Sequence, residues 1–78
     1  MQSALLLDMD VRKQVGLNVQ RIRKEKGWSQ EELAFRAGLH RTYVSGVERG
    51  IRNPTVLVLG QFAEALEVTP STLLSNRG

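Results

Sequence analysis

The stretch SQEELAFRAGLHRTYVSGVERG, residues 29–50, constrains the fold of this 78-residue chain more than any other segment. It opens with Ser29 and has Glu32 three residues later, the S-x-x-E capping box that starts a helix. Apolar residues follow at helical spacing, at Leu33, Ala34 and Ala37. Gly38 then stands where a left-handed residue is needed to end a helix. The first half of the stretch therefore predicts one short helix with defined ends.

The second half of the stretch predicts another short helix. Leu39 is the apolar residue of the turn, and His40 can cap a helix over residues 41–49. Gly50 closes that helix in the left-handed conformation. Two helices that meet at a tight turn form a helix-turn-helix, whose second helix can be presented to a DNA groove.

The outward side of the second helix carries polar side chains. A step of about 100° per residue places the outward residues at Arg41, Thr42, Ser45, Gly46 and Arg49. Val44 and Val47 lie on the inward side, and Tyr43 lies at the boundary. Arginine can donate two hydrogen bonds to guanine O6 and N7, and each good pairing is worth about 1–3 kcal/mol of discrimination. An ordinary solvated helix face has the same composition, so the DNA-reading interpretation depends on the position of this helix in the motif.

Gly46 is unfavourable inside a helix, where glycine costs about 1 kcal/mol relative to alanine. Close approach of the helix to DNA would explain this residue, and so would packing between two subunits. The sequence leaves both explanations open.

Length and composition limit the ways in which the chain can be stabilised. A domain of this size hides only about 60% of the surface that its unfolded chain exposes, so its core is marginal alone. The chain has no cysteine and one histidine, which excludes disulfides and thiolate metal sites and leaves stabilisation to association. We therefore expect a homodimer without metal or cofactor. No apolar run approaches the ~20 residues that span a bilayer, and no signal peptide is visible, which predicts a cytoplasmic protein with no membrane contact.

Positive charge is concentrated in the middle of the chain. The net charge is +3, yet residues 11–54 hold ten of the eleven Lys and Arg residues and only four of the eight acids. Residues 1–10 and 55–78 are each slightly acidic. This placement suits a polyanion such as DNA, although a basic surface alone is often only solvated.

Residues 1–10 are predicted to form an N-terminal arm, and residues 11–78 the domain. The arm contains Leu5, Leu6 and Leu7, which would be a liability if exposed. They either extend the core or grip a partner subunit, and the sequence does not decide between these roles.

The first helix of the domain is expected over residues 11–26, with Asp10 as its cap. Its apolar stripe recurs at intervals of three and four residues, at Val11, Val15, Val19 and Ile22. Gly27 ends the helix, and Trp28 follows directly before the capping box. A lone aromatic residue at such a position is more often a core anchor than a base-stacking platform.

A fourth helix is expected after the loop IRNPT, with Asn53 as its cap and Pro54 at its first position. The inward stripe of this helix is Val56, Leu59, Phe62, Ala63 and Leu66. Leu57 and Val58 lie beyond that stripe, which indicates a second buried face, most simply a dimer interface. The Thr-Pro pair at residues 69–70 repeats the cap-plus-proline start and opens a short fifth helix.

From Val11 to Leu74 the chain resembles the phage repressor and Cro type of helix-turn-helix domain, also called XRE-type. The segments that carry the resemblance are GWSQEELAFRAGLHRTYVSGVERG, the following RNPT and FAEALEVTPSTLL. The resemblance implies an all-α, compact five-helix lambda-repressor-like DNA-binding domain. Within this group, HRTYVSGVERGIRNPT is most similar to the controller proteins of restriction-modification systems, which implies a dimeric regulator of a few operators.

The resemblance also assigns roles to single residues. It implies base reading by residues in the first half of the second motif helix, namely Arg41, Thr42, Tyr43 and Ser45. Phosphate contacts are expected at the start of the first motif helix and around the loop after the second, at Gln30, Arg49, Arg52 and Asn53. A helix start next to an arginine is a ready anion site. The resemblance further implies an ion pair between Arg23 and Glu48 that fixes the first helix against the second motif helix.

These features predict a sequence-specific transcriptional regulator that binds double-stranded DNA as a homodimer on a pseudo-palindromic operator. Its two major-groove half-sites would lie about one turn, ~34–36 Å, apart. The alternative is an antitoxin or adaptor that captures another protein through an apolar surface such as Leu57 and Val58, with DNA binding secondary. An enzyme is disfavoured, because the single histidine lies at a helix cap and no nucleophile with an oriented base can be assembled. No catalytic residue and no small-molecule ligand are expected.

Overall fold

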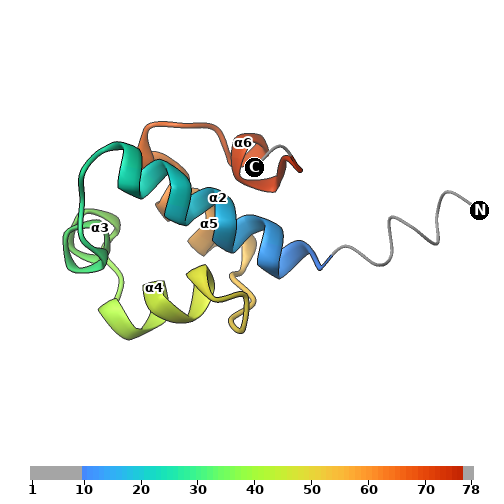
Figure 1. Cartoon of the computed structure of the whole chain (residues 1–78), viewed down its shortest axis with the longest axis horizontal. Coiled ribbons are helices and arrows are strands. Elements are labelled where there is room, and N and C mark those ends of the chain that lie inside the picture. Colours follow the sequence, from blue (N-terminus) through green and yellow to red (C-terminus); the bar gives the residue numbers. More distant parts are fainter. Residues whose placement is uncertain (1–9, 77–78) are drawn as a thin grey trace, which may run out of the picture.

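Each helix of the computed structural model begins directly after a side chain that caps it. The structure describes residues 10–76, which form five helices and no strand (Figure 1): α2 Val11–Glu25, α3 Gln30–Ala37, α4 Arg41–Glu48, α5 Val56–Leu66 and α6 Pro70–Leu74. Each cap accepts a backbone N–H of the first turn, and the caps are Asp10, Ser29, His40, Thr55 and Thr69. The predicted all-α fold class is confirmed. None of the described helices is long and apolar enough to cross a membrane.

The two ends of α3 form where the sequence predicts them. The Ser29 hydroxyl accepts the Glu32 backbone N–H at 3.0 Å, and Gly38 ends the helix with a φ of 71°. The Glu32 carboxylate accepts from Arg36 Nε at 2.6 Å rather than from Ser29, so one half of the capping box forms. α4 ends one residue earlier than predicted, and the left-handed glycine that completes its turn has a φ of 77°.

The start of α5 differs from the prediction. The sequence predicts a helix that starts at Pro54 with Asn53 as its cap, but Thr55 caps a helix that starts two residues later. The Thr55 hydroxyl accepts the Val58 N–H at 3.1 Å. The loop before it folds back onto α4, because two of its backbone N–H groups donate to the Gly46 carbonyl. Asn53 therefore lies exposed in this loop and caps no helix.

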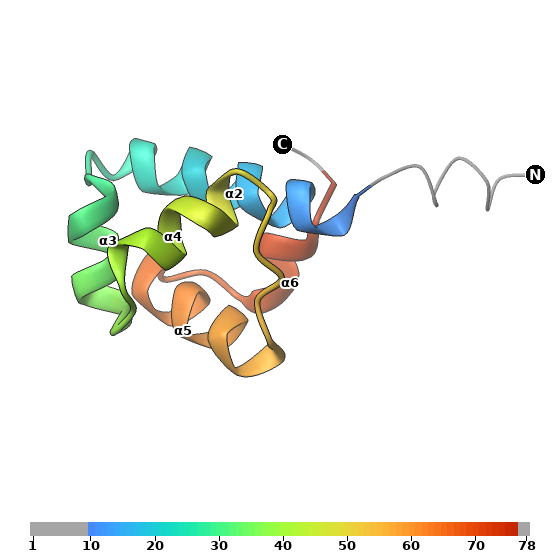
Figure 2. The ribbon, with the colours of Figure 1, turned by 90° about the horizontal axis from the view of Figure 1, so that it is seen from below.

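The hydrophobic core draws on all five helices. α2 packs against both α4 and α6, while α5 packs against α3 and α6 (Figures 1 and 2). The buried apolar residues are Val15, Val19, Ile22, Leu33, Ala34, Ala37, Val44, Val47, Leu59, Phe62, Ala63, Leu66 and Leu73. Val44 and Val47 have no exposed surface, so they dock α4 firmly onto the rest of the fold. The core thus fixes the position of the second motif helix.

Two members of the predicted apolar stripes are exposed. Val11 at the start of α2 has 60% of its surface exposed, and Val56 at the start of α5 has 87% exposed. Each is the first residue of its helix, and Figure 2 shows that the start of α5 projects past the neighbouring helices. Helical spacing predicts which side of a helix faces the core, but it does not predict which residues at the end of the helix extend beyond the core. The remaining residues of both stripes are buried as predicted.

Gly16 sets the distance between α2 and α4. A Cβ atom at this position would lie 2.3 Å from the carbonyl oxygen of Val47 and 2.8 Å from that of Glu48. Both oxygens belong to the backbone, which cannot turn aside as a flexible side chain can. Only glycine therefore allows α2 to approach α4 this closely.

Asn18 links α2 to the end of α6 from inside the core. Its side chain is fully buried, and its Nδ2 donates to the carbonyl of Leu73 at 2.9 Å and to that of Ser75 at 2.7 Å. These carbonyls belong to the last turn of a helix and to the residue after it, where the helix itself supplies no donor. Asn18 thereby acts as the C-terminal cap of α6 from 55 residues away in sequence.

Replacing this asparagine with leucine is expected to destabilise the domain. Asn18→Leu keeps a similar volume but leaves the buried Leu73 carbonyl without its side-chain donor, which costs about 1–3 kcal/mol of unfolding free energy. A urea melt followed by circular dichroism measures this loss. Gln14→Leu, on the same helix and without a side-chain hydrogen bond within the described residues, is the control. An Asn18→Leu midpoint equal to that of the control would show that the cap contributes nothing.

Candidate nucleic-acid interface

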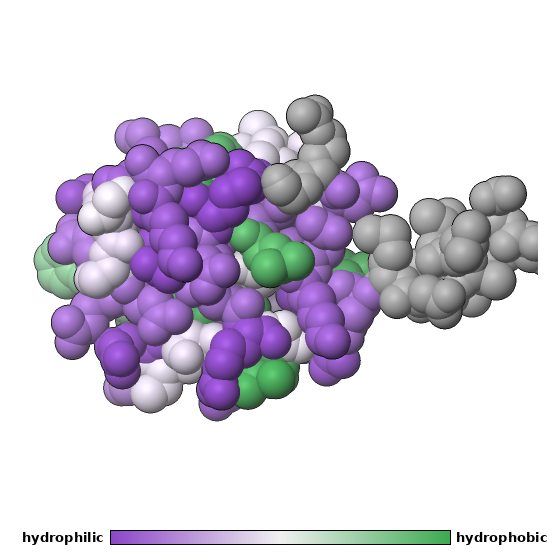
Figure 3. All heavy atoms as spheres, in the orientation of Figure 1, coloured by the Kyte–Doolittle hydropathy of each residue, from purple (hydrophilic) through white to green (hydrophobic). Residues whose placement is uncertain are grey.

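The outward side of α4 is polar and open to solvent. Its exposed or half-buried polar residues are Arg41, Thr42 and Ser45, and the exposed Arg49 follows directly after the helix. Tyr43 is half-buried and packs against the core, which matches its boundary position on the helical wheel. On the face drawn in Figure 3, hydrophobic residues are separate spots in a mainly hydrophilic surface. Three of the predicted base-reading residues, Arg41, Thr42 and Ser45, therefore share the outward side of α4, and Tyr43 lies at its edge.

His40 organises the first turn of α4. Its Nδ1 accepts the Thr42 backbone N–H at 3.1 Å and lies 2.7 Å from the Thr42 hydroxyl oxygen. The cap predicted from the sequence is thus formed, and it holds the threonine side chain at the end of the helix that would enter a groove. Within residues 10–76 no group of three or more His, Cys, Asp and Glu side chains could hold a metal ion.

Gly46 makes room for a side chain of the same molecule. A Cβ atom on Gly46 would lie 2.4 Å from the Cγ atom of Arg52, so the arginine stem crosses the helix directly over the glycine. The Arg52 guanidinium lies 5.5 Å from the centre of the Tyr43 ring. Neither of the two explanations left open by the sequence, DNA approach or subunit packing, includes this intramolecular contact.

The arginines of α4 and of the turn and loop after it form no ion pair with another residue of positions 10–76. The ion pairs of the described residues are Arg12–Asp10, Arg21–Glu25, Arg23–Glu48, Lys26–Glu67 and Arg36–Glu32. In the first of these pairs, the hydrogen bond from Arg12 lowers the pKa of the Asp10 carboxyl. The Lys and Arg residues of positions 10–76 that form no ion pair are Lys13, Lys24, Arg41, Arg49 and Arg52. Three of these five belong to α4 and the turn and loop after it, where their charge is available to an anion.

Lys13 joins this surface although it belongs to α2. A Cβ atom on Gly50 would lie 2.7 Å from Lys13 Cγ and 3.1 Å from Lys13 Cα, so the lysine packs against the turn that ends α4. Lys13 is exposed. No spacing rule relates residue 13 to residue 50, and for this reason the sequence does not single out this lysine.

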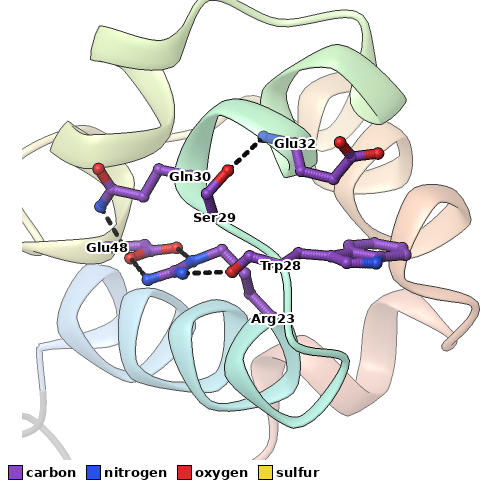
Figure 4. A network of polar contacts seen from close by, with 6 residues as sticks. All are labelled: Arg23, Trp28, Ser29, Gln30, Glu32 and Glu48. Atoms are coloured by element: carbon purple, nitrogen blue, oxygen red, sulfur yellow. Dashed lines mark hydrogen bonds and ion pairs between the residues drawn. The ribbon is translucent and has the colours of Figure 1, made fainter.

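A buried network ties α2, α3 and α4 together (Figure 4). Arg23 on α2 donates to both carboxylate oxygens of Glu48 on α4, at 2.6 and 3.0 Å. The same guanidinium donates to the Trp28 carbonyl at 2.7 Å. The side chains of Arg23 and Glu48 are only 9% and 1% exposed, so this ion pair is shielded from water. It fixes the second motif helix against α2, in the arrangement implied by the resemblance.

Gln30 belongs to this network as well. Its Nε2 donates to Glu48 Oε1 at 3.0 Å, and its side chain is half-buried at the start of α3. The sequence predicts a phosphate contact for Gln30 but not this bond. The bond orients the Gln30 side-chain amide between α3 and α4. An amide NH₂ has two N–H donors, and the second one takes no part in this bond to Glu48.

Trp28 lies at the edge of the core, as the sequence predicts. The residue is partly buried and packs against the core cluster. Its ring is flanked by the Arg36 guanidinium, 4.2 Å from the ring centre, and by the Lys26 ammonium at 5.2 Å. In Figure 4 the ring points away from Glu48 and Gln30. This position suits an anchor between α2 and α3 rather than a stacking platform.

The predicted dimer-interface residues occupy different environments. Leu57 is 77% exposed, next to the exposed Val56 at the start of α5. Val58 is half-buried and packs against the core of its own chain. The exposed apolar residues at the start of α5 are therefore Val56 and Leu57, while Val58 is partly covered by its own chain.

Comparison with known proteins agrees with this geometry. Residues 19–73 match the family described as HTH_3, helix-turn-helix. The uncharacterized HTH-type transcriptional regulator y4dJ of Sinorhizobium fredii is 49% identical over 67 residues, covering 86% of this chain and 87% of that protein. The control protein C.BamHI of Bacillus amyloliquefaciens is 44% identical over 66 residues, covering 83% of this chain and 82% of the other.

Two solved structures extend the similarity to three dimensions. The restriction-modification controller protein C.AhdI from Aeromonas hydrophila superposes with a TM-score of 0.77 at 44% identity, covering 80% of this chain and 94% of that one. The controller protein C.Esp1396I, as a tetramer in complex with its natural 35 base-pair operator, gives a TM-score of 0.76 at 38% identity, covering 85% and 87% of the two chains. Motif, fold and sequence agree: this chain belongs to the HTH_3, or XRE-type, family of DNA-binding transcriptional regulators, which are not enzymes, and is related to restriction-modification controller proteins.

Proposed function

We propose that this protein is a homodimeric regulator that reads two half-sites of a pseudo-palindromic operator through the major groove. The observation that carries the proposal is the outward side of α4, where the exposed Arg41 stands beside Thr42, which is held by the helix cap, and the exposed Arg49 follows the last turn. Neither arginine forms an ion pair within residues 10–76. A helix of this kind, docked on a rigid core, is the recognition element of the motif. The protein would act in the compartment that holds the DNA.

Base reading is assigned to residues within the first five positions of α4. Arg41 and Thr42 stand at its first two positions and are exposed, Ser45 follows one turn later, and the half-buried Tyr43 lies at the boundary. The N-terminal residues of a recognition helix are those that contact base edges. The phosphate contacts proposed beside them are Gln30, Arg49, Arg52 and Asn53, and Lys13 is added for its place against the turn after α4.

Removing the first of these arginines should weaken discrimination. Arg41→Ala is expected to lose about 1–3 kcal/mol of preference at one base pair of each half-site, because a bidentate contact to guanine is worth that much. Fluorescence anisotropy with an operator and its single-base variants measures the preference. Lys24→Ala removes an exposed cation of α2 that, like Arg41, forms no ion pair within residues 10–76, and serves as the matched control. Equal discrimination by Arg41→Ala and the parent protein would exclude Arg41 as a reader.

Dimerisation is proposed to occur through the exposed start of α5. Val56 and Leu57 are the two most exposed aliphatic residues among positions 10–76 and stand side by side in sequence. A small domain that leaves such residues uncovered gains stability when a second copy covers them. A two-fold dimer also matches the two-fold symmetry of a pseudo-palindromic operator.

A charge placed in this apolar surface should separate the subunits. Leu57→Glu introduces like charges opposite each other across a two-fold interface, and it leaves the core intact because Leu57 is 77% exposed. Sedimentation equilibrium should then give the mass of a monomer. On DNA, each monomer should occupy one half-site independently of the other. Leu17→Glu changes a leucine that is 55% exposed on α2 and is the control. A Leu57→Glu protein that stays dimeric would place the interface elsewhere.

The biological role proposed is control of a restriction-modification system. The support is the similarity to C.BamHI and C.AhdI, which covers more than three quarters of each of those chains. Deleting the gene for this protein should change expression of the methyltransferase and endonuclease of a restriction-modification system in the host. An unchanged restriction phenotype, with altered expression of unrelated genes, would favour a general regulator.

A further inference from the structure

The side chain of Arg52 lies across α4, over Gly46 and beside the ring of Tyr43, an arrangement that we call the Arg52 seat. An ideal Cβ atom on Gly46 would lie 2.4 Å from Arg52 Cγ, 3.4 Å from its Cδ and 3.3 Å from its Nε. Three successive atoms of the arginine therefore pass over the one position of the helix that has no side chain. Any larger residue at position 46 forces the arginine to move.

Two further contacts define this seat. The backbone N–H groups of Ile51 and Arg52 both donate to the Gly46 carbonyl, at 3.0 and 3.2 Å, so the loop is folded back over the last turn of α4. The guanidinium then reaches the face of Tyr43, 5.5 Å from the ring centre, which is within cation–π range. Tyr43 packs against the core, so the ring is a fixed support.

We propose that Gly46 and Tyr43 are positioning residues that hold the Arg52 guanidinium ready on the α4 surface to bind a DNA phosphate. Arg52 is exposed and forms no ion pair within residues 10–76, so the seat orders the side chain without neutralising its charge. A long side chain that is ordered before binding loses less conformational entropy when it binds. This inference rests on the proposed DNA-binding function and explains why a helix that faces DNA tolerates a glycine.

Gly46→Ala tests the seat. In this variant Arg52 is no longer ordered before binding, and immobilising one long side chain on binding costs about as much as a 2- to 10-fold change in affinity. Gly46→Ala should therefore bind a duplex operator about 2- to 10-fold more weakly than the parent protein at the same salt concentration. In an Arg52→Ala background, Gly46→Ala should cause no further loss, because the side chain that needs the seat is absent. Close approach of DNA to the glycine would instead give the same loss in both backgrounds. That result, or parent affinity for Gly46→Ala, would overturn the seat.

Tyr43 provides a second arm of the experiment. Tyr43→Phe keeps the ring and removes the hydroxyl, whereas Tyr43→Leu removes the ring. When Arg52 is present, Tyr43→Leu should bind DNA more weakly than Tyr43→Phe does. In the Arg52→Ala background, the two variants should bind equally well. An extra loss that persists without Arg52 would contradict a role for the ring in holding the arginine.

A measurement on the free protein separates the seat from DNA binding. In the parent protein the Arg52 side-chain NMR signals should show a ring-current shift from Tyr43, and Gly46→Ala should abolish it. Stability should not fall in this variant, since alanine favours a helix more than glycine does.

Arg52 signals without a ring-current shift in the parent would overturn the seat. If the shift is present but the parent shows no affinity for duplex DNA, the proposed function fails and the phosphate role of Arg52 fails with it. If the parent binds DNA and Gly46→Ala binds equally well, only the seat fails.

Discussion

Glu48→Ala should destabilise the domain by about 3–5 kcal/mol, because it leaves the Arg23 guanidinium buried without its carboxylate. Both oxygens of Glu48 accept from Arg23, and one of them also accepts from Gln30, so three hydrogen bonds are lost together. Natural domains of this length have a total stability of roughly 5–10 kcal/mol. The substitution therefore removes a large part of the stability of the fold.

Chemical denaturation followed by circular dichroism measures this effect. Glu64→Ala is the control, since Glu64 is exposed and forms no ion pair within the described residues. Glu48→Gln keeps the shape and part of the hydrogen bonding, and it should retain more stability than Glu48→Ala. Replacing both partners, as Arg23→Met with Glu48→Leu, should recover much of the loss, because no buried charge is then left unpaired. A Glu48→Ala protein as stable as the Glu64→Ala control would show that the ion pair does not support the fold.

Gly16→Ala is expected to cost about 1–3 kcal/mol of unfolding free energy, because it forces an extra methyl group into a packed contact. The added Cβ atom would lie 2.3 Å from the Val47 carbonyl oxygen, so α2 and α4 would have to separate. Most of this range exceeds the ~1 kcal/mol that alanine gains over glycine in a helix, so a net loss of stability remains. Because α4 carries the residues proposed to read bases, displaced helices should also weaken DNA binding.

Gly60 offers a matched control for this experiment. It is also a helical glycine, in α5, but a Cβ atom there has no neighbour within 4 Å. Gly60→Ala should therefore be neutral or stabilising by up to about 1 kcal/mol. Thermal melts of the two variants side by side isolate the effect of the helix contact from that of helix propensity. Equal melting temperatures for Gly16→Ala and Gly60→Ala would contradict the close approach of α2 to α4.

Local signals in the sequence predict most of the helices and the inward face of α4. Caps such as Ser29 and His40, and the left-handed Gly38, act within a few residues, so their effect can be recognised without a structure. Thr55 shows the limit of this reasoning. Asn53 and Thr55 are both good caps two residues apart, and the fold-back of the loop onto α4 selects the later one.

Contacts between distant segments could not be predicted in the same way. Asn18 caps a helix that ends more than fifty residues later, and Gly16 is required only because α4 lies against it. Lys13 reaches the surface near α4 only because its stem packs on Gly50. The Arg52 seat over Gly46 likewise depends on how the loop after α4 folds back. Each of these roles follows from the packing of helices, which periodicity does not describe.

Selection of bound sequences from a random pool of duplex DNA tests most directly whether α4 reads DNA as part of a dimer. The parent protein should enrich two symmetry-related half-sites whose centres lie about one turn, or ~34–36 Å, apart. Arg41→Ala, selected in parallel, should lose its preference at one position of each half-site and keep the others. A pool without an enriched motif, or the same motif at full preference for Arg41→Ala, would contradict the assignment of α4 as the reading helix.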